Sequence, residues 1–224
     1  MAIQYVPQGD EFGVSTQTAG NQQYQRITSL ADGGFVVTWW SSPVQNAGSS
    51  GIFCQVFGGD GSRVGNEFRV NTDTVGNVGT PFSLADGGFV VTWDSYDVDR
   101  DGVYGQVFDG DGSRVGSEFR VNTYTTGWQN NQRTTSLADG GFVVTWLSSN
   151  GQDSDGHGVY GQVFDGDGSP VGSEFCVNTY TTDYQGEQHL TVTSRKVVGL
   201  FPEHLGFQFV PVLHHLQGCL CAQG

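Results

Sequence analysis

The residues best suited to chemistry form an acidic loop near the middle of the chain, Asp97-Val98-Asp99-Arg100-Asp101-Gly102. Alternating aspartates followed by glycine are typical of calcium loops, because each carboxylate offers oxygen to a hard cation and the glycine permits a sharp turn. The bidentate acid of an EF-hand loop is missing, since Phe108 occupies its position. We therefore predict calcium ligands at Asp97, Asp99 and Asp101, completed by carbonyls, water or a neighbouring loop. A solvated polar loop is the alternative.

A second copy of this loop follows in the next repeat. Aligned on Val-Tyr-Gly-Gln, it places Asp153, Asp155 and His157 where the three aspartates stand, whereas the earliest copy has no carboxylate at these positions. Asp153 and Asp155 are therefore predicted as further calcium ligands. Calcium is the only cofactor that the sequence indicates.

Other acidic residues have a simpler interpretation. Asp109-Gly110-Asp111-Gly112 and Asp165-Gly166-Asp167-Gly168 lie where a hairpin must turn, and Asp-Gly is common turn chemistry. Catalysis has little support, because the sequence has no serine elbow, no His-Glu-X-X-His and no phosphate loop. We therefore expect turns at these aspartates and no enzymatic activity.

These residues are positioned by an internal repeat that dominates the chain. Ser-Leu-Ala-Asp-Gly-Gly-Phe-Val-Val-Thr-Trp occurs three times, with its leucine at Leu30, Leu84 and Leu137. Glu-Phe-X-Val-Asn-Thr also occurs three times, and a weaker copy, Glu-Phe-Gly-Val-Ser-Thr, begins at Glu11. The repeat predicts a β-repeat domain over 1–194, with units at about 17–72, 73–123 and 124–179 and a partial unit at 180–194.

Each unit has the pattern of four short antiparallel strands. Two β-prone runs surround Asp-Gly-Gly, two more surround Asp-Gly-Asp-Gly, and no stretch has the helical period. In Phe142-Val143-Val144-Thr145-Trp146 both faces of the strand are largely apolar, so the strand needs cover on both sides. We predict an all-β fold of propeller-like blades, three complete and one partial. An open β-array or a sandwich is the alternative.

Two tryptophans fall outside the repeated pattern. Trp39, Trp93 and Trp146 end the most apolar strand of their units, which predicts core packing. Trp40 and Trp128 occur elsewhere and are candidates for exposure. After Ser194 the repeat stops within its motif, and the tail 195–224 contains no aspartate but three of the five histidines. A change of reading frame or a divergent cap would each account for this tail.

Composition narrows the choice of partners. The chain of 224 residues has 35 glycines and a formal charge of −14, which argues against nucleic acid and anionic membrane surfaces as partners. No apolar run is long enough to insert into a membrane, and the first ten residues lack the features of a signal peptide. The four cysteines do not share a register in the repeat, so they predict no disulfide framework.

The repeated blocks Ala-Asp-Gly-Gly-Phe-Val-Val-Thr-Trp, Gly-Val-Tyr-Gly-Gln-Val-Phe-Asp and Val-Gly-X-Glu-Phe-X-Val-Asn-Thr resemble a known kind of tandem repeat over residues 9–194. It is the repeat of large secreted bacterial proteins that also carry haemolysin-type (RTX) calcium-binding and adhesin modules. The resemblance implies a bacterial source, a secreted or cell-surface location and dependence on calcium. The glycine-rich nonapeptide run of true haemolysin-type repeats is absent from this chain.

From these observations we expect a non-enzymatic secreted repeat module that binds calcium and serves adhesion or surface display. Repeated loops favour multivalent contacts with a cell-surface or glycan ligand. An unpaired blade edge also favours self-association. Two alternatives stay open, a carbohydrate-binding β-propeller lectin and a non-functional fragment of a larger repeat protein.

Overall fold

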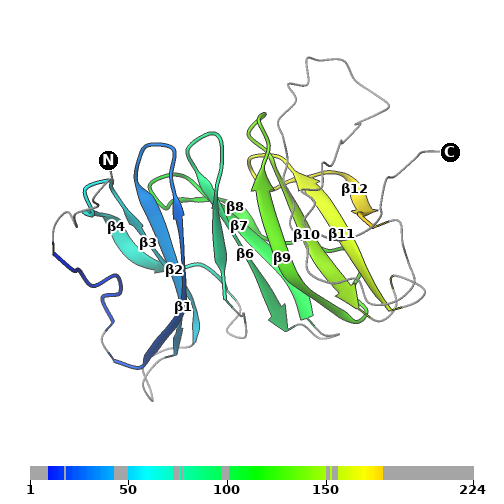
Figure 1. The fold of residues 1–224 in the computed structure, drawn as a ribbon, viewed down its shortest axis with the longest axis horizontal. Helices are drawn as coiled ribbons and strands as arrows, with labels where there is room; N and C mark the ends of the chain where they lie inside the picture. The colour runs from blue at the N-terminus through cyan, green and yellow to red at the C-terminus, as the bar shows by residue number, and fades with distance from the viewer. Residues whose placement is uncertain are drawn as a thin grey trace, which may run out of the picture.

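The computed structural model describes residues 10–17, 19–42, 50–72, 76, 78–96, 101–149, 152 and 156–178, without the side chains of Tyr96 and Asp101. In these residues the chain forms three four-stranded antiparallel sheets, which we call blades 1, 2 and 3 (Figure 1). Within each blade the strands are ordered as in the sequence. The predicted all-β fold of propeller-like blades is confirmed for the three complete units, whereas the predicted partial unit 180–194 and the tail 195–224 lie outside the described residues.

The strand bounds follow the repeat. Blade 1 consists of β1 (Asn21–Ser29), β2 (Phe35–Ser42), β3 (Gly51–Phe57) and β4 (Arg63–Arg69). Blade 2 consists of β5 (Thr80–Ser83), β6 (Phe89–Tyr96), β7 (Asp101–Phe108) and β8 (Arg114–Arg120). Blade 3 consists of β9 (Trp128–Ser136), β10 (Phe142–Ser149), β11 (His157–Phe164) and β12 (Pro170–Cys176).

The first hairpin of each blade turns at Asp-Gly-Gly. In blade 1 the Gly34 N–H donates to Asp32 Oδ1 at 2.8 Å, and Gly33 has a φ of 88°, in the left-handed region that favours glycine. A Cβ on Gly34 would lie 2.5 Å from the Phe57 carbonyl oxygen, so the turn packs directly against the next strand. The same turn recurs at Asp86 and Asp139. These aspartates therefore shape the turn between the first two strands of each blade.

The core lies between the blades. One cluster joins Val36, Ile52 and Val56 of blade 1 to Phe89 and Trp93 of blade 2. The next cluster lies between blades 2 and 3. In it the other face of blade 2 packs against the face of blade 3 that carries Phe142, Val144, Trp146 and Phe164. Apolar side chains on both faces of a central strand are therefore buried by neighbouring blades, as the alternation predicts. The repeated tryptophans Trp39, Trp93 and Trp146 are all buried.

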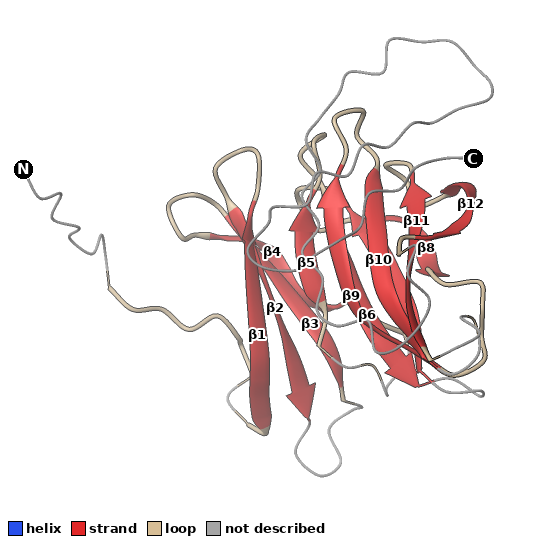
Figure 2. Cartoon of the chain, turned by 45° about the vertical axis from the view of Figure 1, so that its right-hand side comes forward, coloured by secondary structure: helices blue, strands red, loops and turns tan. Residues whose placement is uncertain are grey.

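The first strand of each blade forms the inner edge of the array. β1 contacts β5, and β5 contacts β9, so these three strands lie side by side (Figure 2). β4, β8 and β12 form the outer edge, at the other end of each sheet. Both β1 and β9 begin at the lower rim of the molecule, as it is drawn in Figure 1. Among the described residues no helix is long and apolar enough to cross a membrane.

Candidate functional site

The lower rim of blade 3 carries a row of three polar or aromatic side chains. Ser149, the last residue of β10, lies opposite Trp128 of β9 and opposite His157 of β11. Residues directly opposite on antiparallel strands project from the same face of a sheet. Trp128, Ser149 and His157 therefore stand next to one another on the face of blade 3 that points away from blade 2.

The three side chains differ in exposure. Trp128 is 48% exposed, an unusual state for a large aromatic side chain, whereas Ser149 is only 2% exposed and His157 is half-buried. Ser149 Oγ and His157 Nδ1 are 2.7 Å apart and share a hydrogen bond. Since Ser149 Oγ is covered, its role here is to orient the imidazole. The result is an exposed indole and a hydrogen-bonded imidazole that lie on either side of Ser149, two strands apart.

A buried amide holds the start of β9 in place. Gln129 is completely buried, and its Nε2 donates to Ser148 Oγ at 2.9 Å. Its Oε1 accepts a hydrogen bond from Trp146 Nε1 at 2.9 Å. These two hydrogen bonds fix Gln129, the residue after Trp128, and therefore restrict the backbone that carries the indole.

The other two blades lack this network in the part of the chain that is described. Gly76 occupies the position of Gln129 in the second repeat, and Trp93 Nε1 is buried there without a hydrogen-bond partner. In the first repeat the corresponding residue is Gln22, yet Trp39 Nε1 also has no partner. The rim of blade 3 is therefore specialised relative to the rims of blades 1 and 2.

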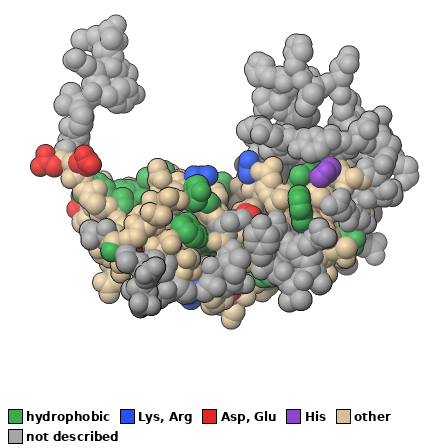
Figure 3. All heavy atoms as spheres, turned by 90° about the horizontal axis from the view of Figure 1, so that it is seen from below, with side chains coloured by type: hydrophobic (Ala, Val, Ile, Leu, Met, Phe, Trp, Pro, Cys, Tyr) green, Lys and Arg blue, Asp and Glu red, His purple; other side chains and the backbone are tan. Residues whose placement is uncertain are grey.

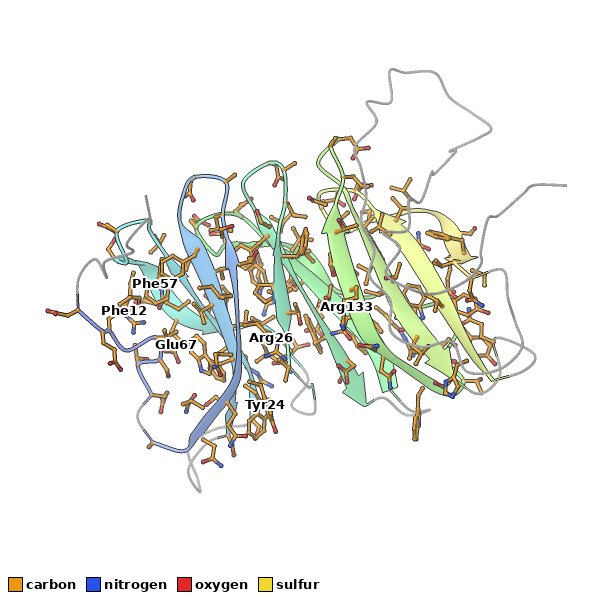
Figure 4. All side chains as sticks on the ribbon, in the orientation of Figure 1. Phe12, Tyr24, Arg26, Phe57, Glu67 and Arg133 are labelled. Atoms are coloured by element: carbon orange, nitrogen blue, oxygen red, sulfur yellow. The ribbon has the colours of Figure 1, made fainter. Side chains whose placement is uncertain are left out.

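Blade 1 carries a second exposed aromatic residue near its lower rim. Tyr24 is 56% exposed and lies toward the lower end of β1 (Figure 4). Its φ of 58° places it at a bulge, and Asn131 holds the same position in β9 with a φ of 56°. The bulge therefore recurs in both nine-residue inner strands, and in blade 1 it presents a tyrosine to solvent.

This arrangement fits recognition of a hydroxyl-rich ligand. Exposed indole and phenol rings offer a flat apolar face together with a polar edge, and a neutral imidazole both donates and accepts hydrogen bonds. Seen from below, most of the described surface is apolar or uncharged, with few acidic or basic side chains (Figure 3). A neutral polar ligand meets no strong electrostatic barrier on such a surface.

The predicted calcium ligands are not tested by the structure. Asp97, Asp99, Asp153 and Asp155 lie outside the described residues, and Asp101 begins β7 with its side chain undescribed. Among the described residues no group of three His, Cys, Asp or Glu side chains is arranged to hold a metal ion. The calcium site stays a prediction.

The aspartates of the second hairpin are turn residues, as the sequence predicted. The Ser62 hydroxyl donates to Asp60 Oδ1 at 2.6 Å and lowers the pKa of Asp60. The Ser113 N–H does the same for Asp111, whose pKa is also lowered. In blade 3 a hydrogen bond with Asp167 raises the pKa of Asp165. Each carboxylate is therefore engaged locally in its turn.

The sequence analysis identified some residues of this rim but did not predict that they lie together. Trp128 was singled out as lying outside the repeated pattern, and its exposure is confirmed. Trp40, singled out with it, is half-buried. The Ser149–His157 pair and the support from Gln129 were missed. The available signal was the difference between repeats, since His157 replaces an aspartate and Gln129 replaces a glycine of the second repeat.

Comparison with known proteins supports the fold. No protein-family model matches the sequence, and neither does any curated protein. Among solved structures, an endo-arabinase from Bacteroides thetaiotaomicron matches at 14% identity with a TM-score of 0.43, over 75% of this chain and 66% of its own. A protein of unknown function from Dyadobacter fermentans matches at 12% identity with a TM-score of 0.52, over 70% of this chain and 51% of its own.

A thermostable family-43 glycoside hydrolase matches at 10% identity with a TM-score of 0.47, over 73% of this chain and 56% of its own. This chain therefore spans between about half and two thirds of the length of these proteins. At 12% identity and a TM-score of 0.52, the similarity to the Dyadobacter fermentans protein shows a shared fold alone.

These matches correct two expectations from the sequence. The chain was expected to be a non-enzymatic calcium-binding module for adhesion, and it was expected not to be an enzyme. The structural neighbours with a named activity are an endo-arabinase and a family-43 glycoside hydrolase, which are enzymes that act on carbohydrate rather than adhesion modules. The expectations of an adhesion module and of a chain without enzymatic activity were wrong, because they rested on carboxylate spacing in loops and on missing catalytic motifs rather than on the surface that the blades build, whereas the calcium ligands stay untested.

Proposed function

We propose that this chain binds carbohydrate at the lower rim of blade 3, as part of a carbohydrate-active protein. The observation that supports this most directly is the exposed Trp128 on the same face as His157, with Ser149 between them orienting the imidazole. A sugar ring presents apolar C–H groups on its faces and hydroxyls at its edge. An indole packs against the former, while an imidazole pairs with the latter.

The rigidity of the rim supports the same proposal. Binding is tighter when the receptor loses little conformational freedom, and Trp128 begins a strand whose next residue is held by two buried hydrogen bonds. Tyr24 adds a second aromatic residue on the same rim, at blade 1.

The test is calorimetric titration of the whole chain with a panel of neutral polysaccharides, arabinan among them. Trp128→Ala is expected to weaken binding at least about tenfold, because loss of a stacked aromatic side chain is typically worth more than about 1 kcal/mol at a binding hot spot. Asn21→Ala is the matched control, since Asn21 is the exposed residue that holds the position of Trp128 in the first repeat.

Release of reducing sugar should be measured on the same panel, so that binding and turnover are read together. Equal affinities for the unaltered chain and for Trp128→Ala would remove the rim of blade 3 from consideration. Failure of the unaltered chain to bind any member of the panel would overturn the proposal as a whole.

A further inference from the structure

Two arginines and a threonine share one position of the repeat on the inner strands. Arg26 of β1, Thr80 of β5 and Arg133 of β9 each lie opposite a buried threonine in the second strand of their blade. All three are exposed, and we call them the inner row (Figure 4). Since β1 contacts β5 and β5 contacts β9, the inner row runs across the inner edge from blade 1 to blade 3.

Buried hydrogen bonds between the blades hold the inner row in register. The Thr38 hydroxyl donates to the Gly79 carbonyl at 2.7 Å, and Gln132 Nε2 donates to the Thr92 carbonyl at 3.3 Å. Gly79 and Gln132 directly precede the members of the row in blades 2 and 3. Neighbouring members are therefore kept at a fixed separation by the packing of the blades.

The two guanidinium groups of the row are held in the same way. Arg26 donates from Nη1 to the Gln25 carbonyl, and Arg133 donates from Nη1 to the Gln132 carbonyl, both at 3.0 Å. Among the described residues no carboxylate pairs with either group. Because a guanidinium has five N–H donors in a planar fork, each group keeps most of its donors for a ligand.

The other described arginines serve the scaffold. Arg63 and Arg114 each donate to a glutamine of their own blade and to two backbone carbonyls of a segment that precedes it. Arg69 and Arg120 are half-buried at the outer edge. In the part of the chain that the structure describes, the arginines of the inner row make no hydrogen bond to another strand. The stability of the blades therefore gives no reason for two cations at this position.

The described acidic residues lie away from the inner row. Asp32 and Asp139 are the nearest in the sequence to Arg26 and Arg133, and each accepts the N–H of its own turn. Both strands continue for three residues beyond the arginine, about 10 Å, before that turn begins. Asp94 lies on β6, outside the inner edge, and is half-buried. Since exposed charges more than about 10 Å apart are largely screened by salt, the inner row is locally cationic in an acidic molecule.

Each arginine of the row shares its strand with an exposed aromatic residue. Tyr24 lies two residues before Arg26 and is 56% exposed, and Trp128 lies five residues before Arg133 and is 48% exposed. Both aromatic residues lie between the row and the lower rim. A ligand that packs on either ring and extends along the strand therefore reaches a guanidinium.

We propose that the inner row binds the carboxylate groups of an acidic polysaccharide whose sugar rings pack on the aromatic residues of the lower rim. The proposal rests on the carbohydrate function proposed above and names the class of polysaccharide, a polymer that contains uronic acid rings. A guanidinium pairs with a carboxylate through two parallel N–H···O hydrogen bonds, and such charge-assisted bonds are stronger than neutral ones. The Thr80 hydroxyl, between the two arginines, offers a donor to a further oxygen.

The spacing of the row favours a polymer over a single sugar. Packed sheets lie about 10 Å apart, and Arg26 and Arg133 belong to blades that have a whole blade between them. A ligand that engages both arginines must therefore extend over more than one sugar ring. With one cation at each end of the row, it must also have at least two carboxylates.

The experiment compares polygalacturonate with its methyl ester, which has the same sugar rings without the charge. Calorimetric titration of the full chain is expected to show at least about tenfold tighter binding of the acid form, because hydrogen bonds to charged groups contribute more than neutral ones. The difference is expected to shrink as sodium chloride is raised, because salt screens exposed charges.

Substitution of the row removes this preference. Arg26→Gln and Arg133→Gln are each expected to weaken binding of the acid form by about tenfold and to leave binding of the ester unchanged. The double variant is expected to bind both forms equally. Ser117→Glu is the matched control, since it makes the net charge more negative by one unit at an exposed position of β8, on the outer edge. It is expected to bind the acid form as the unaltered chain does.

The outcomes separate this proposal from the carbohydrate function itself. Equal affinity of the unaltered chain for the two forms would overturn the inner row as a carboxylate site, while binding that Trp128→Ala weakens would leave the carbohydrate function intact. Binding of the acid form that depends on both arginines but not on Trp128 would support the row and overturn the site at the rim of blade 3.

Two further outcomes would also overturn the assignment to carboxylates. Equal losses from Ser117→Glu and from Arg133→Gln would show that net charge governs binding, rather than the inner row. Binding of a sulfated glucan as tightly as polygalacturonate would show that the row accepts any polyanion.

Discussion

The outer and inner edges of the blades follow different rules. At the outer edge, phenylalanine packing and the glutamate–threonine contact recur at blades 1, 2 and 3 with nearly the same distances. At the inner edge, β5 has only four residues, whereas β1 and β9 have nine and contain a bulge. Uniform contacts indicate a scaffold, and divergent ones indicate a surface that serves something other than stability. The carbohydrate proposal therefore belongs at the inner edge and its rim.

The largest expected effect comes from the outer edge. Arg114→Ala leaves Gln106 Oε1, which is fully buried, without its donor at 2.7 Å, and it frees two carbonyls of blade 1. We expect the free energy of unfolding to fall by about 2–3 kcal/mol, because an unsatisfied buried polar group keeps its desolvation penalty. Urea denaturation followed by tryptophan fluorescence measures this loss.

Arg133→Ala provides the inner-edge comparison. Arg133 is exposed, and the hydrogen bond from its Nη1 goes to the carbonyl of its own neighbour, Gln132. Its removal is expected to change the free energy of unfolding by less than about 0.5 kcal/mol. Equal losses for Arg114→Ala and Arg133→Ala would abolish the distinction between the two edges.

A difference between the repeats at the outer edge predicts an effect of intermediate size on stability. Blade 3 has Pro170 where blades 1 and 2 have Arg63 and Arg114, so the arginine contact is missing between blades 2 and 3. Gln162 keeps the hydrogen bonds from its Nε2 that Gln106 makes in blade 2. Pro170→Arg is therefore expected to stabilise the chain by about 1 kcal/mol, as one additional hydrogen-bonded group between blades.

Thermal denaturation by circular dichroism measures this gain, with Pro170→Ala as the control that removes the ring without adding the guanidinium. A gain that both variants share would come from the backbone of β12 rather than from a restored arginine contact. Destabilisation by Pro170→Arg would show that the two interfaces between blades are built differently.

Local rules explain why the strands could be predicted from the sequence. Asp-Gly-Gly and Asp-Gly-Asp-Gly specify tight turns within a few residues, and alternating apolar residues specify which faces are buried. Trp39, Trp93 and Trp146 follow from that alternation, and all three are buried. These features depend on near neighbours in the sequence, so a single sequence contains them.

The contacts between blades depend on distant parts of the chain. Thr16 and Glu67 are 51 residues apart, as are Thr123 and Glu174. The repeat shows that such pairs are equivalent but not that they touch, because this depends on how consecutive sheets stack. For the same reason the Glu11–Thr16 copy was recognised without its role. The rim was missed because Trp128, Ser149 and His157 come from three strands that only pairing brings together.

The smallest expected effect concerns the bulge that β1 and β9 share. Tyr24 and Asn131 both adopt a left-handed φ, near 58° and 56°, a conformation that asparagine tolerates better than tyrosine. Tyr24→Asn is therefore expected to stabilise the chain by about 0.5 kcal/mol, even though it removes an exposed aromatic residue. Asn131→Tyr is the reciprocal change and should destabilise the chain by a similar amount. The measurement is the thermal midpoint of both variants. Shifts in opposite directions would show that the two inner strands share one backbone geometry although their side chains differ. If both changes lowered the midpoint, the tyrosine would be making contacts of its own, and the inner edge of blade 1 would be part of the scaffold after all.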